Sequence, residues 1–293
     1  MARLTIQNIL AMPNPTFHLN SPNPRAPEIR ISWINAQHCR VRRWDDFNLG
    51  NLSSAFGDVL SQPASVGIGP VAAHREVQNL SEMKNDCINS LLNILEGPVD
   101  SGRRLLGHRL GSTMPIAHSQ NIKLQGGYVP SLTFYINAAS RALLVVSCAR
   151  LSATWTSEEL QNHESGDTSP ICQLATYARE SKTRYGFVMT DKEVVVVRFS
   201  VGTCGEYIAE WQAIPRSAND EGVLTVGLAV WSLVMMSLNE NHRTVATETQ
   251  TLPINLWWGE QRAGGDINYR HHLSGRELPS LHSGAVRWFK KAQ

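Results

Sequence analysis

Two β-rich runs, residues 128–136 and 142–150, form the clearest pattern of apolar and polar positions in the chain. The polar, turn-forming residues between them are typical of a β-hairpin connection. A four-residue loop over 138–141 would close this hairpin. The pattern therefore predicts two antiparallel strands joined by a short loop.

That loop length fixes which side chains meet. It places Ser131 opposite Cys148, and opposed residues have Cβ atoms about 5 Å apart. Side chains alternate between the faces of a strand, so Ser131, Cys148 and Arg150 are expected to converge on one face. A slip of one residue in the register would send one strand's set to the other face.

Helical spacing appears on both sides of the hairpin. Apolar residues recur every three or four positions over 81–95, which predicts an amphipathic helix with Ser81 as a candidate cap. Downstream, Ser169 is expected to cap a second helix whose first turn holds Pro170. Two helices are thus expected to flank the strands.

Two further segments read as buried. Residues 194–197 are four valines without alternation, which suggests a strand covered on both faces. Residues 223–238 carry no charge and follow Asp220-Glu221, a good helix start. Sixteen residues are short for a membrane span, which needs about 20, so a buried core helix is predicted.

The ends of the chain look different from this core. Five prolines over 13–27 predict an extended arm, and prolines and glycines over 62–71 predict a linker. We therefore expect an N-terminal extension (1–75), a core (76–243) and a C-terminal extension (244–293). The last segment is rich in tryptophan and includes His271-His272, whose adjacency argues against a shared zinc ion.

Composition sets the outer bounds. With 42% hydrophobic and 18% charged residues, the 293-residue chain can bury a large core. Its net charge of +2 does not indicate nucleic-acid binding, which usually needs a basic face; the clusters of arginines at 40–43 and 103–104 are small.

Five cysteines with no Cys-x-x-Cys pair favour reduced thiols, and no apolar signal region is evident. We expect a protein of the cytoplasm or nucleus with no membrane association.

The order of these motifs resembles the PD-(D/E)XK, or restriction-endonuclease-like, superfamily, especially its small fungal members. Pro130-Ser131 stands where that family has Pro-Asp, and Cys148-Ala149-Arg150 stands where it has Glu-x-Lys. Gln173 and Tyr177 match the Gln-x-x-x-Tyr signature of the RecB-type branch. Trp155 and the run 184–198 match an aromatic after the hairpin and a closing hairpin. The resemblance covers roughly residues 80 to 240 and implies an α+β fold, an α/β/α-like arrangement with a mixed central sheet flanked by helices.

The departures from the family pattern bear on function. Metal-dependent cleavage needs hard oxygen ligands and a lysine, whereas Ser131 offers a hydroxyl, Cys148 a soft sulfur and Arg150 a permanent cation. Glu82 or Asp86 of the first helix could instead reach the site, although acids on a helix surface are usually solvated. We expect no magnesium-dependent nuclease activity and no cofactor.

The site residues expected from this comparison are Ser131, Cys148, Arg150, Gln173 and Tyr177. Gln173 and Tyr177, four apart on a helix, would point toward one pocket. The leading hypothesis is a metal-independent role on a small organic molecule, such as a cyclisation or rearrangement in fungal specialised metabolism. The alternative is a non-enzymatic pseudo-nuclease that binds a protein or a nucleic acid, because fold alone does not choose between the two.

Overall fold

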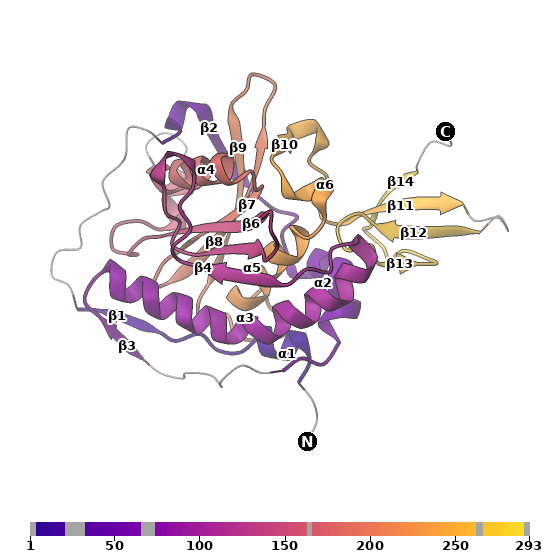
Figure 1. The fold of residues 1–293 in the computed structure, drawn as a ribbon, viewed down its shortest axis with the longest axis horizontal. Helices are drawn as coiled ribbons and strands as arrows, with labels where there is room; N and C mark the ends of the chain where they lie inside the picture. The colour runs from indigo at the N-terminus through magenta and orange to yellow at the C-terminus, as the bar shows by residue number, and fades with distance from the viewer. Residues whose placement is uncertain (1–3, 21–32, 66–73, 163–165, 262–265, 290–293) are drawn as a thin grey trace.

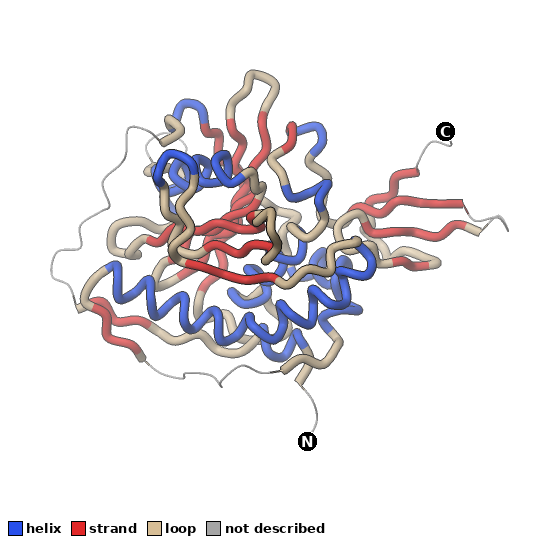
Figure 2. Tube along the Cα trace, in the orientation of Figure 1, coloured by secondary structure: helices blue, strands red, loops and turns tan. Residues whose placement is uncertain are grey.

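The computed structural model is an α+β protein with a mixed central sheet between two helical layers (Figures 1 and 2). It describes residues 4–20, 33–65, 74–162, 166–261 and 266–289. The α-helices are α1 (Ile6–Leu10), α2 (Leu49–Leu60), α3 (Leu80–Leu110), α4 (Ser169–Ser181), α5 (Val226–Met236) and α6 (Glu240–Arg243). Short 3-10 helices lie at η1 (Ala36–His38), η2 (Gln125–Gly127), η3 (Ser157–Gln161) and η4 (Glu248–Gln250).

The main sheet has the strand order β2-β9-β8-β7-β6-β5-β4, with β10 added beside β8. Its strands are β2 (Cys39–Arg43), β4 (Ile116–Ser119), β5 (Thr133–Ile136), β6 (Leu143–Ala149), β7 (Tyr185–Met189), β8 (Glu193–Val201), β9 (Tyr207–Pro215) and β10 (Ala246–Thr247). The β6–β7, β9–β2 and β8–β10 pairs are parallel and the others antiparallel. The sheet is therefore mixed, as expected.

Two smaller sheets complete the fold. The strands β1 (Phe17–Leu19) and β3 (Arg75–Val77) pair in parallel. The strands β11 (Leu256–Gln261), β12 (Ile267–His271), β13 (Glu277–Leu278) and β14 (Val286–Phe289) form a four-stranded sheet. This C-terminal sheet projects from the main body (Figure 1). The arm expected over 13–27 is described up to Asn20 and includes β1; residues 21–32 lie outside the described residues, as do 66–71 of the expected linker.

The two faces of the main sheet carry separate apolar cores. Alternate valines of β8 show this clearly, because Val194 and Val196 pack with α1, α2, α3 and α5, whereas Val195 and Val197 pack with α4. All four are buried, which confirms the prediction of a strand covered on both faces. The two-sided burial places α3 and α4 on opposite sides of the hairpin β5–β6.

The core helix predicted over 223–238 is confirmed, but it begins later than predicted, at Val226. Every residue of α5 is buried. The cap is Thr225, whose hydroxyl accepts the Leu228 N–H at 3.2 Å and donates to the Leu10 carbonyl at 2.7 Å. The predicted start at Asp220-Glu221 is wrong, because the hydroxyl of Thr225 satisfies the helix end and ties it to α1.

The helix predicted over 81–95 also exists, but α3 extends over 31 residues, beyond Pro98. Trp231 of α5 donates its indole N–H to the Pro98 carbonyl at 2.9 Å, which ties α5 to this turn of α3. The predicted cap at Ser81 is wrong. Asn79 caps the helix by accepting the Glu82 N–H, and the Glu82 carboxylate accepts hydrogen bonds from the Asn79 side-chain amide and from the Gln78 N–H.

The start of α4 is close to the prediction. Pro170 lies in the first turn as expected. Ser169, expected as the cap, is instead the first helical residue. The Asp167 carboxylate accepts both the Ser169 N–H at 2.8 Å and the Ser169 hydroxyl at 3.0 Å. An upstream carboxylate thus replaces the hydroxyl that the sequence suggested.

Candidate functional site

The hairpin register determines what reaches the candidate site. Thr133 pairs with Val146 and Phe134 with Val145, as predicted. A β-bulge then shifts the register, so Tyr135 pairs with Leu143 and not with Leu144. The predicted pairing is confirmed at Thr133 and Phe134 and is wrong by one residue near the loop. The predicted pair Ser131–Cys148 lies beyond the pairs that the two strands form.

Ser131 lies just before β5 and is half-buried. Its backbone N–H donates to the Ser147 carbonyl at 2.9 Å, which keeps it beside the end of β6. The hydroxyl that fixes this crossing belongs to Ser147, which sequence reasoning did not single out. It accepts the Leu132 N–H at 2.9 Å and donates to the Leu132 carbonyl at 3.1 Å.

Arg150, Gln173 and Tyr177 come together in one hydrogen-bonded chain. The Arg150 guanidinium donates to Gln173 Oε1 at 2.6 Å, and Gln173 Nε2 donates to the Tyr177 hydroxyl oxygen at 2.5 Å. A second guanidinium nitrogen of Arg150 donates to the Ala149 carbonyl at 2.8 Å. The spacing of four on α4 therefore brings the amide and the phenol to the end of β6.

Two aromatic side chains, Trp33 and Tyr128, cover this polar chain. The Trp33 ring centre lies 6.0 Å from Arg150 Cζ, and the next residue, Ile34, donates its N–H to the Thr176 hydroxyl of α4 at 2.9 Å. Tyr128 adds a ring 6.0 Å from that of Tyr177. Arg150 and Tyr177 are each only 5% exposed. The expected pocket is therefore closed here, and Trp33 and Tyr128 cover it.

Cys148 is buried in the same region. Its thiol donates to the Pro170 carbonyl at 3.7 Å. Burial raises the pKa of the Cys148 thiol to about 11, although the nearby Arg150 cation acts in the opposite direction. The side chain is therefore a protonated thiol at neutral pH and unsuited to act as a nucleophile or a metal ligand.

No acid of α3 takes the place of the carboxylates that the PD-(D/E)XK resemblance leads us to expect at this site. Glu82 is used in the cap of α3, and this helix packs on the sheet face opposite α4. The carboxylates of Asp191 and Glu193, at the turn between β7 and β8, hold Ser152 and Ser157 by hydrogen bonds of 2.5–2.8 Å. Within the described residues no group of three or more His, Cys, Asp or Glu side chains is placed to hold a metal ion.

The paired histidines lie at the root of the C-terminal sheet. His271 Nε2 is 2.7 Å from the Ile254 carbonyl, and His272 Nδ1 is 3.2 Å from His242 Nε2. Burial is the main cause that lowers the pKa of His242 to about 4 and that of His271 to about 3, and it lowers the pKa of His272 as well. These side chains are neutral packing residues at neutral pH.

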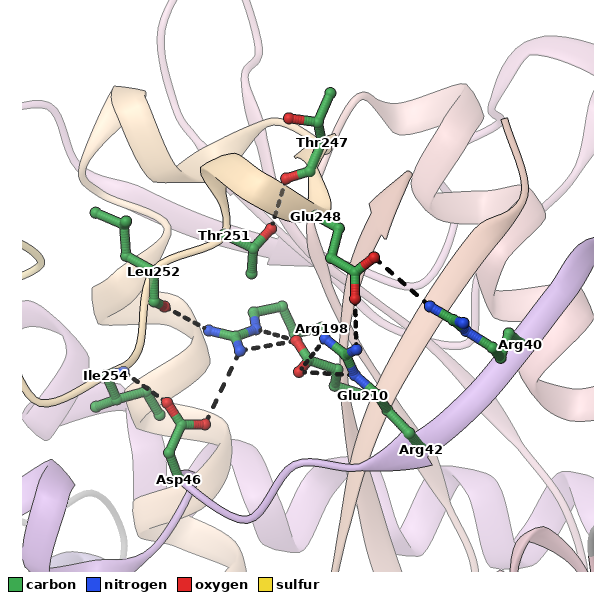
Figure 3. Close-up of polar contacts among 10 residues, drawn as sticks. All are labelled: Arg40, Arg42, Asp46, Arg198, Glu210, Thr247, Glu248, Thr251, Leu252 and Ile254. Carbon is green, nitrogen blue, oxygen red and sulfur yellow. Dashed lines mark hydrogen bonds and ion pairs between the residues drawn. The ribbon is translucent and has the colours of Figure 1, made fainter. Parts of the chain in front are cut away.

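A second polar cluster crosses the main sheet between β2, β8 and β9 (Figure 3). Arg198 and Glu210, on paired strands, form a buried ion pair of 2.7 Å. Arg42 contacts Glu210 at 3.0 Å and Glu248 of η4 at 2.5 Å. Arg198 also donates to the Leu252 carbonyl at 2.9 Å. Sequence reasoning missed this cluster because its members come from four distant segments and match no spacing rule.

Two cavities lie away from the Arg150 chain. One, of about 380 Å³, lies between α3 and the strands β4 and β5. The other, of about 600 Å³, is more open and lies between residues 62–65 and the second half of α3. None of the five expected site residues lines either cavity.

Comparisons of the chain with family models, with curated proteins and with solved structures return no match. Among the described residues, no helix has the length and apolar character needed to cross a membrane.

Proposed function

We propose that the chain is a nuclease-like protein that has lost metal-dependent cleavage and acts as a non-enzymatic module that binds another protein. The element order supports the ancestry. The helix α3, the hairpin β5–β6, the helix α4 and the hairpin β7–β8 follow one another as the PD-(D/E)XK resemblance implies. The observation that carries the loss of activity is the Arg150–Gln173–Tyr177 chain, in which Arg150 and Tyr177 are buried and Gln173 is half-buried.

That chain leaves no role for a metal ion or for an attacking water. Its hydrogen bonds link the side chains to one another, and Trp33 shields it from solvent. A catalytic site that cleaves DNA must admit a phosphodiester and hold a divalent cation through carboxylate oxygens. A buried guanidinium beside a thiol with a raised pKa does neither.

Charge favours a protein over a nucleic acid as the partner. The arginines at 40–43 make contacts within the molecule. Arg40 and Arg42 pair with Glu248, and Arg43 stacks on Trp211. Arg103 and Arg104 both pair with Asp100. These carboxylates offset part of the positive charge of both clusters, which lowers the affinity that the clusters can add for DNA or RNA.

A cleavage assay tests this proposal. We expect no nicking of supercoiled plasmid or of short duplexes in Mg²⁺ or Mn²⁺, and no salt-dependent DNA binding by fluorescence polarisation. Turnover that disappears in Ser131→Ala or Arg150→Ala would refute the proposal. An unrelated contaminating nuclease would survive both substitutions, which makes the two variants the necessary control.

A small-molecule role is the second candidate, and one observation favours it. The indole N–H of Trp33 is buried without a hydrogen-bond partner in the described structure, and it belongs to the ring that covers Arg150. An organic anion that displaced this ring would meet a guanidinium, an amide and a phenol. A thermal-shift screen of organic acids against the protein and Arg150→Met tests this; stabilisation must vanish in the variant.

A further inference from the structure

The edge of the main sheet beside α3 combines three features that none of the proposals above uses. The strand β4 ends the sheet on this side, the cavity of about 380 Å³ lies between it and α3, and the acidic residues Glu96 and Asp100 line that cavity. Figure 1 shows β4 running alongside the long helix. We call this region, lined by residues of α3, β4 and β5, the α3–β4 groove.

We propose that the α3–β4 groove binds an extended peptide segment of a partner protein, which adds a strand to β4 and places an apolar side chain in the cavity. This inference rests on the proposed binding function and names its surface and partner class. Strand addition to a free sheet edge is an established mode of peptide recognition, in which main-chain hydrogen bonds supply affinity and side-chain pockets supply specificity.

The hydrogen-bonding pattern shows which groups of β4 are available. Ile136 donates its N–H toward β6, to the Ala142 carbonyl, so the pair Ile116–Ile136 carries no hydrogen bond between β4 and β5. Pairs alternate along an antiparallel ladder, so His118 is likewise outside the β4–β5 bonds. The N–H and C=O groups of Ile116 and His118 therefore point outward from the sheet, toward an incoming strand.

The groove supplies an apolar site beside that edge. Ile116, His118 and Phe134 form its sheet side, and Leu92, Leu95 and Val99 form its helical side. The helical residues recur at positions three and four apart and so share one face of α3. A cavity of this size and lining accommodates one large aliphatic or aromatic side chain of the added strand.

The negative charge of Glu96 at the groove indicates which residue the partner peptide carries next to the apolar side chain that enters the cavity. Glu96 lines the groove, is exposed, and makes no ion pair among the described residues. Asp100, one turn further on, is already bound by Arg103 and Arg104. Alternate side chains of a strand point the same way, so the partner should carry a Lys or Arg two residues from its apolar anchor. A second copy of this chain would instead bring another Glu96 to the edge.

Selection from a random peptide library displayed on phage tests the groove with the full-length protein as bait. We expect enriched sequences to share an apolar-x-basic pattern. The most enriched peptide, synthesised with a fluorophore, is then titrated by fluorescence polarisation. His118→Pro should weaken binding about tenfold, because it removes an outward N–H without touching the β4–β5 bonds. The matched variant His118→Ala keeps that N–H and should bind within about threefold of the original protein.

The charge prediction has its own pair of variants. Glu96→Lys should weaken binding more than Glu96→Gln, and the difference should shrink at high salt. These surface changes also cover the case in which His118→Pro fails to fold, as judged by its melting curve. Equal binding of the peptide to the original protein, His118→Pro and Glu96→Lys would overturn the proposal, as would a selection without enrichment. A dimer in light scattering that His118→Pro converts to a monomer would assign the edge to a second copy and overturn it too.

The result of the peptide-binding test can be distinguished from the result of the cleavage assay. DNA turnover that depends on Arg150 would refute the loss of activity without changing the comparison of His118→Pro with His118→Ala. Peptide binding that is unchanged in both His118→Pro and Glu96→Lys would refute the proposed α3–β4 groove site. The absence of DNA cleavage would not be affected by that result.

Discussion

Single side chains account for the closed candidate site. Arg150, which stands where the PD-(D/E)XK resemblance leads us to expect a lysine, donates to the Gln173 amide oxygen, and the Trp33 ring centre lies 6.0 Å from its Cζ. Cys148, which stands where the same resemblance leads us to expect a carboxylate, donates to the Pro170 carbonyl at the start of α4. A guanidinium and a buried thiol are both poor ligands for a hard cation such as Mg²⁺.

Thiol reactivity provides a test at this scale. Four of the five cysteines are buried and Cys204 alone is exposed. We expect a thiol reagent such as Ellman's to label one equivalent rapidly in the native protein and five in denaturant, because attack requires an accessible thiolate. In Cys204→Ser the rapid phase should disappear. A rapid phase that persists there but is lost in Cys148→Ser would show that the site is open and reactive.

At the scale of elements, the Arg198–Glu210 pair joins the central strands to the C-terminal segment. Arg198 is reached by Glu210 on β9, by Asp46 after β2 at 3.9 Å and by the Leu252 carbonyl after η4. These contacts tie segments that no continuous strand or helix connects (Figure 3). The cluster is therefore a structural junction of charges between these segments.

Removing one partner of this junction should be costly. Glu210→Gln leaves the buried Arg198 without its closest counter-charge, and we expect a loss of about 3–5 kcal/mol in the free energy of unfolding by urea titration. Glu248→Gln is the matched control. Its side chain is 33% exposed against 10% for Glu210, so its loss should stay below about 1 kcal/mol. Similar losses in both variants would contradict the junction.

For the molecule as a whole, the buried histidines couple stability to pH at the root of the C-terminal sheet. His242 and His271 have folded-state pKa values of about 4 and about 3, below the ordinary 6.5. The causes are burial and, for His242, the cations of Arg184 and Arg198. Between about pH 3 and pH 6.5, the histidines of the unfolded chain therefore bind more protons than those of the folded protein.

The sign of the pH effect follows. Stability from these groups is fully present above pH 6.5 and is lost as the pH falls toward 4 and then 3, so the melting temperature should fall over this window. Replacing His242 with asparagine should reduce the slope of melting temperature against pH. The same change at the exposed His108 should leave the slope unaltered, and a slope insensitive to both would refute the coupling.

The local pattern of the sequence predicted several elements because their causes are local. The hairpin register at Thr133, the proline-led start of α4, the doubly buried β8 and the core helix α5 each follow from alternation, spacing or a turn residue within a short window. The contact between Gln173 and Tyr177 follows equally from a spacing of four on one helix.

Tertiary structure decided the features that depend on distant segments. The parallel pairing of β2 with β9, the Trp33 cover over Arg150 and the Arg198–Glu210 junction all join residues far apart in the chain. Such contacts leave no periodic trace, because each partner is a single residue or short strand whose local propensity is ordinary. The sequence by itself determined that the metal-binding carboxylates are absent from the hairpin. Only the packing of the N-terminal segment against α4 decided that the space beside Arg150 is filled.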